Sequence, residues 1–521
     1  MTASTLAAAF LSAAIGADPP DDFALSPPPG PFVEQSLEDA SKTAPFAAGT
    51  PVIATTYFYW YDAATNLHVI DPDGTDALTD HPPTLEGFSY KSVDWHARQL
   101  DDMIAAGIDV AMPVYWGVPY TADTWSDQGL PKLVAARERL LQQGKNPPAI
   151  GMFYDTSTLA HNSRHWHVDL TTAAGQRWFY GTIRNFYSYI PARHRACIDG
   201  KPLVLLYSVE FAAGVDEKLF PAVRELFRAD FGTDLYLVKM RGWPGEADSE
   251  YQWGGSIAPR ILDTAGIGPG YDHSAVPGRK PLVRHREDGR FYEFAWQRLL
   301  GMDPATRPWL VHLETWNEFH EGTEICETAE YGRKYIELSR RYADRFHARE
   351  RFDPAAGPPV PEVVAAAPAK FEGLHVVPKD DGDGPLVLRH VDGRTAWSTT
   401  RNRQSEVHRY MYFDADYAFL YDGNDSLELT VGYFDAGPES FVLQYDSCNP
   451  ELNGLKQEFR EGGRQEIEDS GTWKEVTFVI PHARFADRAN ECDFRLASQR
   501  SDLKISHVSL IRVSEKQGGS E

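Results

Sequence analysis

Apolar runs typical of buried strands alternate with helical patterns from residue 51 to residue 352, and this alternation constrains the fold most. The expected strands are residues 52–61, 110–116, 149–154, 203–207, 235–239, 251–257, 265–271 and 309–314. The expected helices are residues 93–106, 130–143, 173–189, 221–231, 292–300 and 329–347. Eight strands with helices between them predict an α/β domain, a (β/α)8 TIM barrel over residues 51–352.

The pattern changes after residues 353–370, which hold five Pro and six Ala and are expected to form a linker. Residues 371–515 then show short alternating strands separated by turn residues such as Asp422, Gly423 and Asn424. This pattern predicts an antiparallel β-sandwich domain.

Residues 1–17 are small and apolar, as in a signal peptide, and indicate a secreted or periplasmic protein. Residues 18–50 are rich in Pro and are expected to be an extended lead-in to the barrel. Later in the chain no apolar run reaches about 18 residues, so no membrane insertion is expected.

The formal net charge of −24 argues against a nucleic-acid partner, because like charges repel the phosphate backbone. Four cysteines are too few for a disulfide scaffold. Cys448 and Cys492 both lie beside expected strands, so a disulfide between them is open if the protein is exported.

Two acids three residues apart, Glu318 and Glu321, follow the last apolar strand of the expected barrel. Active sites of barrel enzymes lie at the carboxyl ends of the strands, where these acids would stand. A carboxylate pair beside aromatic residues suits glycosidic bond cleavage, which needs one group to protonate the leaving oxygen and one to assist its departure. A solvated helix face and a metal site built from Glu318, His320 and Glu321 are the alternatives; no His-Glu-x-x-His spacing supports the metal site.

Aromatic and polar residues at the ends of the other expected strands suit a sugar-binding site, because rings stack on sugar faces and polar groups bind hydroxyls. The candidate substrate-binding residues are Tyr59, Trp60, Trp116, Tyr154, Asp155, Glu210, Tyr271, Asn317 and His320.

Four segments, residues 57–61, 105–117, 268–272 and 316–323, make the barrel resemble glycoside hydrolase family 99, the endo-α-mannosidases. The resemblance implies a retaining α-glycosidase that uses no metal or cofactor. It also implies that Glu318 acts as the base on the sugar 2-hydroxyl and that Glu321 is the general acid/base. Phe319 stands where the family usually has Trp. The C-terminal sandwich looks like a carbohydrate-binding module of multidomain bacterial glycosidases.

The sequence therefore predicts a retaining glycoside hydrolase acting on an oligo- or polysaccharide, an α-mannan-like glycan cleaved in endo mode. Two alternatives remain open: a non-catalytic carbohydrate-binding protein, and a hydrolase like the related α-1,3-glucanases.

Overall fold

The computed structural model describes residues 18–33, 45–279, 282–353, 360–379, 383, 386–400, 409–498 and 502–513. The chain divides into two compact units. The first, here called the barrel unit, comprises Thr2–Arg279 and Met302–Arg351. The second, the β-rich unit, comprises Lys280–Gly301 and Phe352–Glu521. The expected signal peptide, residues 1–17, lies outside the described residues.

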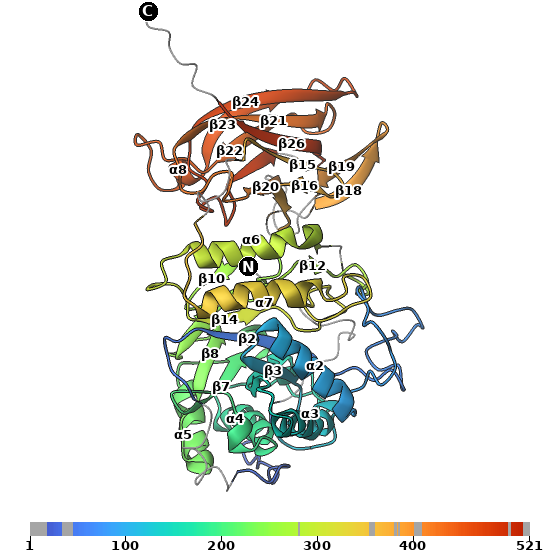
Figure 1. Cartoon of the computed structure of the whole chain (residues 1–521), viewed down its shortest axis with the longest axis vertical. Helices are drawn as coiled ribbons and strands as arrows, with labels where there is room; N and C mark the ends of the chain where they lie inside the picture. Colours follow the sequence, from blue (N-terminus) through green and yellow to red (C-terminus); the bar gives the residue numbers. More distant parts are fainter. Residues whose placement is uncertain are drawn as a thin grey trace, which may run out of the picture. The chain divides into compact units, whose positions relative to one another are not determined.

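Parallel strands form a nearly closed ring in the barrel unit (Figure 1). In ring order they are β2 (Val52–Tyr57), β3 (Val110–Tyr115), β4 (Ala149–Ile150) with β5 (Met152–Tyr154), β7 (Lys201–Leu206), β8 (Tyr236–Met240), β9 (Ser249–Tyr251), β11 (Thr264–Ile267) and β14 (Leu310–Leu313). β14 pairs with β2, which brings the end of the unit back to its beginning. Between β9 and β11 the described backbone shows no pairing, and a 2.6 Å hydrogen bond joins the hydroxyls of Ser249 and Thr264 instead.

Short strands flank the ring. They are β1 (Pro45–Phe46), β6 (Cys197–Ile198), β10 (Arg260–Ile261) and β12 (Tyr271–Asp272). The main strands β2, β3 and β14 are buried along their whole length. Burial on both faces explains why these strands appear in the sequence as continuous apolar runs.

The helices of the barrel unit are α2 (Val93–Ala106), α3 (Trp125–Gln142), α4 (Ala173–Ser188), α5 (Leu219–Phe231) and α7 (Lys334–His347). Side-chain caps fix three of the starts: Ser92 accepts from Trp95 N, Thr124 forms a capping box with Asp127, and Thr172 accepts from Gly175 N. In the described part of the chain no helix follows β8 or β9. The strict (β/α)8 pattern is therefore not met, although the parallel, barrel-like sheet is present.

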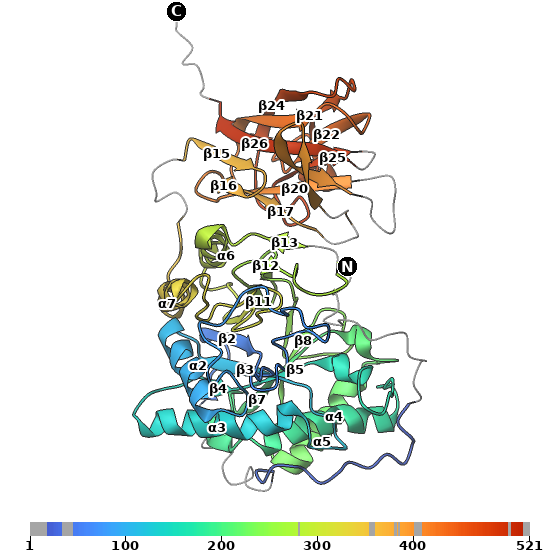
Figure 2. The same cartoon turned by 90° about the vertical axis from the view of Figure 1, so that its right-hand side faces the viewer.

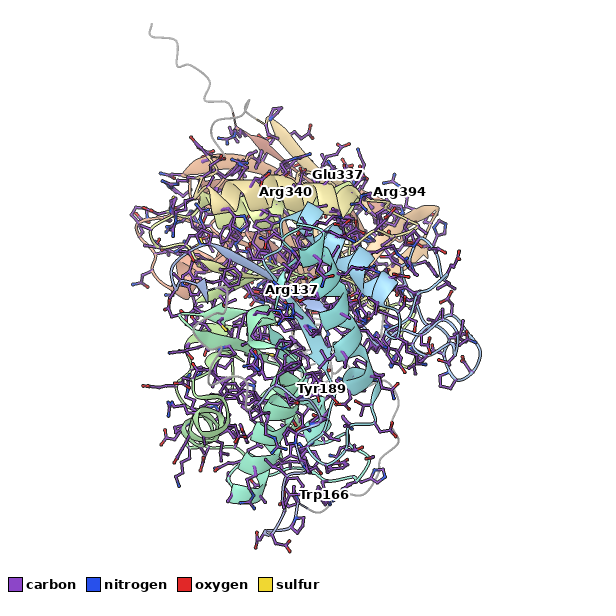
Figure 3. The ribbon with its side chains drawn as sticks, turned by 60° about the horizontal axis from the view of Figure 1, so that its bottom comes forward. Arg137, Trp166, Tyr189, Glu337, Arg340 and Arg394 are labelled. Atoms are coloured by element: carbon purple, nitrogen blue, oxygen red, sulfur yellow. The ribbon has the colours of Figure 1, made fainter. Side chains whose placement is uncertain are left out.

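Arg137 of α3, labelled in Figure 3, connects its helix by hydrogen bonds to the segment before β4 and to His194. Its Nε donates to the Pro148 carbonyl at 2.7 Å, and its Nη1 donates to His194 Nδ1 at 2.6 Å. Burial and the charge of Arg137 lower the pKa of His194 to about 4, so the ring stays neutral and can accept this bond.

The described part of the Pro-rich lead-in packs along the barrel unit. Phe23 contacts Trp166 and Trp178, with ring centroids 5.9 and 5.8 Å apart, and Trp166 is labelled in Figure 3. The Gly30 N–H donates to Ser188 Oγ of α4 at 2.9 Å. Residues 18–33 carry no helix or strand of their own, and these contacts fix them to the barrel unit.

Two antiparallel sheets make up most of the β-rich unit (Figure 2). The first contains β15 (Glu362–Ala366), β16 (Lys370–Glu372), β18 (Leu386–Val391), β19 (Arg394–Thr399), β21 (Asp425–Phe434), β24 (Trp473–Ala483) and β26 (Lys504–Arg512). The second contains β17 (Leu374–Val377), β20 (Arg409–Ala415), β22 (Ser440–Tyr445), β23 (Arg460–Glu466) and β25 (Phe494–Ser498). One apolar cluster includes Leu429 and Leu510 of the first sheet and Phe413 and Leu496 of the second.

Two expectations about this region need correction. The linker expected over residues 353–370 is wrong for residues 362–366, because β15 pairs with β26 there and buries Val363 and Ala365. Residues 280–301, expected within the barrel, group with the β-rich unit and carry β13 (Val283–Arg284) and α6 (Arg290–Gly301). Their apolar helical pattern does not reveal which core they join.

The β-rich unit also contains the one-turn helix α8 (Leu455–Glu458). Cys448 and Cys492, for which a disulfide was left open, are not joined by one in the described part of the chain. Among the helices that the structure describes, none combines the length and the apolar character that crossing a membrane requires.

Candidate active site

The segment that follows β14 lies at the carboxyl end of the barrel strands and is fixed to the end of β2. The side chain of Asn317 pairs with the backbone of Phe58, accepting from its N–H at 2.8 Å and donating to its carbonyl at 2.6 Å. The Tyr61 hydroxyl donates to the Asn317 carbonyl at 3.1 Å. These bonds fix the position of Glu318, the residue after Asn317, next to the end of β2.

Glu318 is buried and paired with His320. Its Oε1 accepts from the His320 N–H at 3.0 Å and lies 2.7 Å from His320 Nδ1. The other ring nitrogen, Nε2, lies 3.1 Å from the carbonyl oxygen of His68. Both ring nitrogens therefore face oxygen atoms, an arrangement that suits a doubly protonated ring.

The pKa values of this pair follow from burial and mutual attraction. Burial raises the pKa of Glu318, and the His320 charge offsets part of that rise. Burial alone would lower the pKa of His320, but the Glu318 carboxylate raises it. Glu318 Oε2 is buried and has no hydrogen-bond partner among the described residues. One oxygen of Glu318 is thus oriented by the protein, and the other has its lone pairs unused.

Glu321 is also buried and forms an ion pair with Arg279, in which Arg279 Nη1 lies 2.5 Å from Glu321 Oε1. The Tyr271 hydroxyl lies 3.5 Å from the same Arg279 nitrogen and 2.9 Å from His273 Nδ1. Burial raises the pKa of Tyr271, and the negative charge of Glu321 raises it further. The charge of Glu321 also raises the pKa of Glu318, so the two carboxylates act on each other.

Aromatic rings gather beside His320. Trp60 stacks on His68 with ring centroids 4.5 Å apart, and its ring lies 5.5 Å from His320. Trp116 and Trp125 approach the same Trp60 ring edge-on, at 5.8 and 6.1 Å. Both of these tryptophans are only partly buried, so they retain accessible aromatic surface near the acids.

A third buried acid, Asp155, lies beside Trp116. The indole Nε1 donates to Asp155 Oδ2 at 2.5 Å, and Ser157 N donates to Oδ1 at 3.0 Å. Burial raises the pKa of Asp155. Burial raises the pKa of Tyr207, and the charges of Glu321 and Asp155 raise it further.

The structure thus places His320 beside Glu318 and Tyr271 beside Glu321. Trp60 contacts His320, Trp116 contacts Trp60, and Asp155 is bonded to Trp116. Four other candidates have different surroundings. Tyr59 donates to the Ser126 carbonyl of α3 at 3.0 Å, and the Tyr154 ring packs 4.8 Å from Phe179 of α4. Both rings therefore face the helix layer. The side-chain amide of Asn317 is already bonded to the Phe58 backbone, and Glu210 is exposed on the 3-10 turn η4 (Val209–Phe211).

Sequence reasoning missed Arg279, His68 and Glu314. Glu314 directly follows β14 and is buried, with Oε2 accepting from Gly254 N at 3.0 Å and from Ser256 N at 3.4 Å. Burial raises its pKa to about 7. Glu314 could have been found from the sequence, because it is an acid at the end of an apolar strand. Arg279 could not, because it lies in an irregular segment with no pattern that marks a site residue.

The comparisons with known proteins agree with the predicted resemblance of the barrel to endo-α-mannosidases. The chain is 34% identical over 104 residues to a glycoprotein endo-alpha-1,2-mannosidase-like protein of Homo sapiens, which covers 17% of this chain and 22% of the relative. It is 34% identical over 95 residues to the protein of the same name from Mus musculus, covering 15% and 20%. The matched part spans about a fifth of these curated relatives.

Solved structures also match, among them the following two. The GH99 endo-alpha-mannosidase from Bacteroides thetaiotaomicron is 16% identical, covers 58% of this chain and 99% of that chain, and gives a TM-score of 0.43. A family 35 carbohydrate binding module from Clostridium thermocellum is 12% identical, covers 29% of this chain and 98% of that chain, and gives a TM-score of 0.18. The family model described as "Domain of unknown function (DUF5010)" matches residues 38–356, more than half of the chain, and the chain belongs to that family.

Proposed function

We propose that this protein is a retaining glycoside hydrolase that cleaves an α-linked, mannose-containing glycan. The burial of Glu318 and Glu321 together at the carboxyl end of the barrel strands carries this proposal. The names of the curated relatives, endo-alpha-1,2-mannosidase and mannosidase-like protein, support mannose as the sugar and endo action as the mode.

In the proposed reaction Glu318 takes the proton of the sugar 2-hydroxyl. The 2-oxygen then attacks the anomeric carbon, the glycosidic bond breaks, and Glu321 gives its proton to the leaving oxygen. Water opens the resulting anhydro-sugar as Glu321 takes a proton from it and Glu318 returns one to the 2-oxygen. The net configuration is retained.

The surroundings of Glu318 suit the base. His320 holds Oε1 and orients the carboxylate, while the buried Oε2 has no partner and can accept a substrate proton. Trp60, Trp116 and Trp125 provide ring surface on which a sugar can stack.

The test compares kcat/KM of Glu318→Gln and Glu321→Gln on an α-mannan and on an aryl α-mannoside with a good leaving group. Loss of a positioned acid or base costs about 10²–10⁴-fold in rate. Glu321→Gln should lose that much on mannan and much less on the aryl substrate, because a good leaving group needs little protonation. Glu318→Gln should lose on both substrates.

The wild-type product must first be shown to retain the anomeric configuration by NMR. Glu217→Gln, a change at an exposed position of the barrel unit, is the control and should match the wild type. Near wild-type rates for both active-site variants would refute the assignment of the pair.

A non-catalytic carbohydrate-binding protein is the second candidate, and the Arg279–Glu321 ion pair favours it. The Arg279 guanidinium, 2.5 Å from Glu321 Oε1, occupies an oxygen that a general acid would direct at the leaving oxygen of the substrate. In the enzyme, glycan binding must therefore draw Arg279 away from Glu321. Glycan binding by calorimetry, without turnover of any α-mannan or α-glucan, would favour this second function.

Further parts of the proposal concern the rest of the chain. We propose that the β-rich unit binds carbohydrate, as modules attached to glycosidases do. We also propose that the protein is exported, on the basis of the apolar residues 1–17. Cell fractionation with an antibody to the protein tests export, and affinity electrophoresis on mannan tests glycan binding by the β-rich unit.

A further inference from the structure

Three aspartates of the β-rich unit meet far from the proposed catalytic acids in sequence. Asp414 lies on β20, while Asp487 and Asp493 lie between β24 and β25. One carboxylate oxygen from each can be chosen so that all three lie within 4.8 Å of one another. All three side chains are buried, at 3%, 8% and 1% exposure. Buried like charges this close repel strongly unless something neutralises them.

Some oxygens of the group are bonded within the protein. Asp493 Oδ2 accepts from Ala415 N at 2.9 Å, and its Oδ1 accepts from Asp487 N at 3.5 Å. Asp487 Oδ2 accepts from the Tyr417 hydroxyl at 2.6 Å. These bonds hold two of the three carboxylates, those of Asp487 and Asp493, in position.

Two other oxygens of the group have no such partner. Asp414 Oδ1 and Asp487 Oδ1 are both buried, and no hydrogen-bond donor reaches either of them in the described part of the chain. A buried carboxylate oxygen without a donor is costly and calls for an unseen partner. Because these oxygens belong to the three-aspartate group, the missing partner belongs there too.

The nearby cations do not balance the group. Arg298 of α6 pairs with Asp487, its Nε lying 3.2 Å from Oδ2, which leaves a formal excess of two negative charges on the aspartates. The charge of His375 also attracts the Asp414 carboxylate. The two ring nitrogens of His375 are, however, already paired with Glu287 at 2.5 Å and with Asp416 at 2.6 Å.

Arg284 is the third cation with an electrostatic attraction to the Asp414 carboxylate. Its Nη1 donates to the Val376 carbonyl at 2.7 Å, and its strongest acidic neighbour is Glu287. Arg284 is therefore directed toward a different acid. An excess of two charges matches one divalent cation.

We propose that Asp414, Asp487 and Asp493 bind one Ca²⁺ ion in the β-rich unit. All three donors are carboxylate oxygens, which hard cations prefer. Ca²⁺ binds oxygens at about 2.3–2.6 Å, so two oxygens on one ion lie at most about 5 Å apart, which fits this group. Mg²⁺ fits less well because it demands a near-ideal octahedron, and Zn²⁺ because it prefers nitrogen and sulfur.

The test uses the full chain after removal of bound metal with a chelator. Calorimetric titration with CaCl₂ should show one site, and Ca²⁺ should raise the Tm of the chain, because an ion that binds the folded state stabilises it. Asp414→Asn and Asp487→Asn should each weaken Ca²⁺ binding at least ~10-fold, since even changes in groups that support a metal ligand cost that much.

Asp435→Asn is the matched control. Asp435 is a buried aspartate of the same unit, but Lys474 lies 2.8 Å from its carboxylate and Ser470 donates to it at 2.6 Å. This variant should have a lower Tm than the wild type and should keep the full rise in Tm on addition of Ca²⁺.

Terbium luminescence keeps the test decisive if the aspartate variants fail to fold. Tb³⁺ bound to the wild-type chain should be sensitised by the ring of Tyr417, which is bonded to Asp487. Ca²⁺ should compete the signal away at far lower concentrations than Mg²⁺. Absence of Ca²⁺ binding in the wild type would overturn the proposal. Unchanged binding in folded aspartate variants would overturn it as well, as would a metal-independent gain in Tm on Asp414→Asn, which indicates shared protons.

Discussion

Glu314 is a fully buried acid that links the stability of the barrel unit to pH. Burial raises its pKa from 4.5 to about 7 in the folded state. A raised carboxyl pKa means that the folded state binds the proton more tightly than the unfolded state does. The resulting stabilisation is fully present below pH 4.5 and is lost as the pH rises toward 7.

Glu314→Gln should remove this pH dependence, because the amide does not titrate. At about 1.4 kcal/mol per pKa unit, the free energy of unfolding of the wild type relative to the variant should fall by ~3 kcal/mol between pH 4.5 and 7.5. Urea unfolding followed by tryptophan fluorescence at several pH values measures this difference.

The neighbouring His312 does not confuse the comparison. Burial lowers its pKa to about 3, so it stays neutral in the folded state across this range in both proteins. Glu217→Gln serves as the control and should leave the pH dependence unchanged. A Glu314→Gln protein with the pH dependence of the wild type would mean that Glu314 stays charged when buried.

At the scale of elements, the side chain of Asn317 joins the end of β14 to the end of β2. Asn317→Ala would leave the N–H and the carbonyl of Phe58 buried without their present partners. Each of the two orphaned buried groups costs about 1–3 kcal/mol, so the free energy of unfolding should fall by ~2–6 kcal/mol. Denaturant unfolding measures the loss.

Asn146→Ala, a change at an exposed position of the barrel unit, is the control for this prediction and should be neutral. Without the two hydrogen bonds of the Asn317 side chain, the next residue, Glu318, should also be displaced. A variant with full stability would show that water or neighbouring groups satisfy the Phe58 backbone.

The sequence predicted the positions of most barrel elements, because buried parallel strands and amphipathic helices leave clear patterns. The expected helix at residues 93–106 coincides with α2, and the strand expected at 309–314 contains β14. The sixth strand was displaced: residues 251–257 were expected, but β9 ends at Tyr251. The residues beyond it turn instead, and the N–H groups of Gly254 and Ser256 bond to Glu314.

The site was only partly predictable, because strand-end positions do not reveal which way a side chain points. Residues 57–61 are all aromatic, so no polar–apolar alternation distinguishes Trp60, which faces His320, from Tyr59, which faces the helices. Arg279 depends on the path of an irregular loop, which no periodic pattern encodes. Local patterns therefore located the acids, and tertiary packing decided their partners.

At the scale of the whole chain, the β-rich unit is discontinuous in sequence. It takes α6 and the turn before it from the middle of the chain, and both sheets from the C-terminal part. The middle segment supplies charged partners to buried groups of the sheets: Glu287 lies 2.5 Å from His375, and Arg298 lies 3.2 Å from Asp487. It also supplies Phe294, whose ring lies 5.1 Å from that of Tyr417.

A fragment of residues 360–521 should therefore be far less stable than the same residues in the full chain. It retains both sheets but loses Glu287 and Arg298, and removing one partner of a buried ion pair costs about 3–5 kcal/mol. His375 shows the effect: Glu287 and Asp416 together overcome burial and raise its pKa to about 10, and the fragment keeps only Asp416.

Adding a synthetic peptide of residues 282–301 should restore part of the stability, and the same peptide with Glu287→Gln and Arg298→Gln should restore less. Circular dichroism melting curves compare the mixtures. A fragment that melts at the temperature of the β-rich unit in the full chain would mean that the C-terminal part folds without the middle segment, and that α6 only covers a finished core.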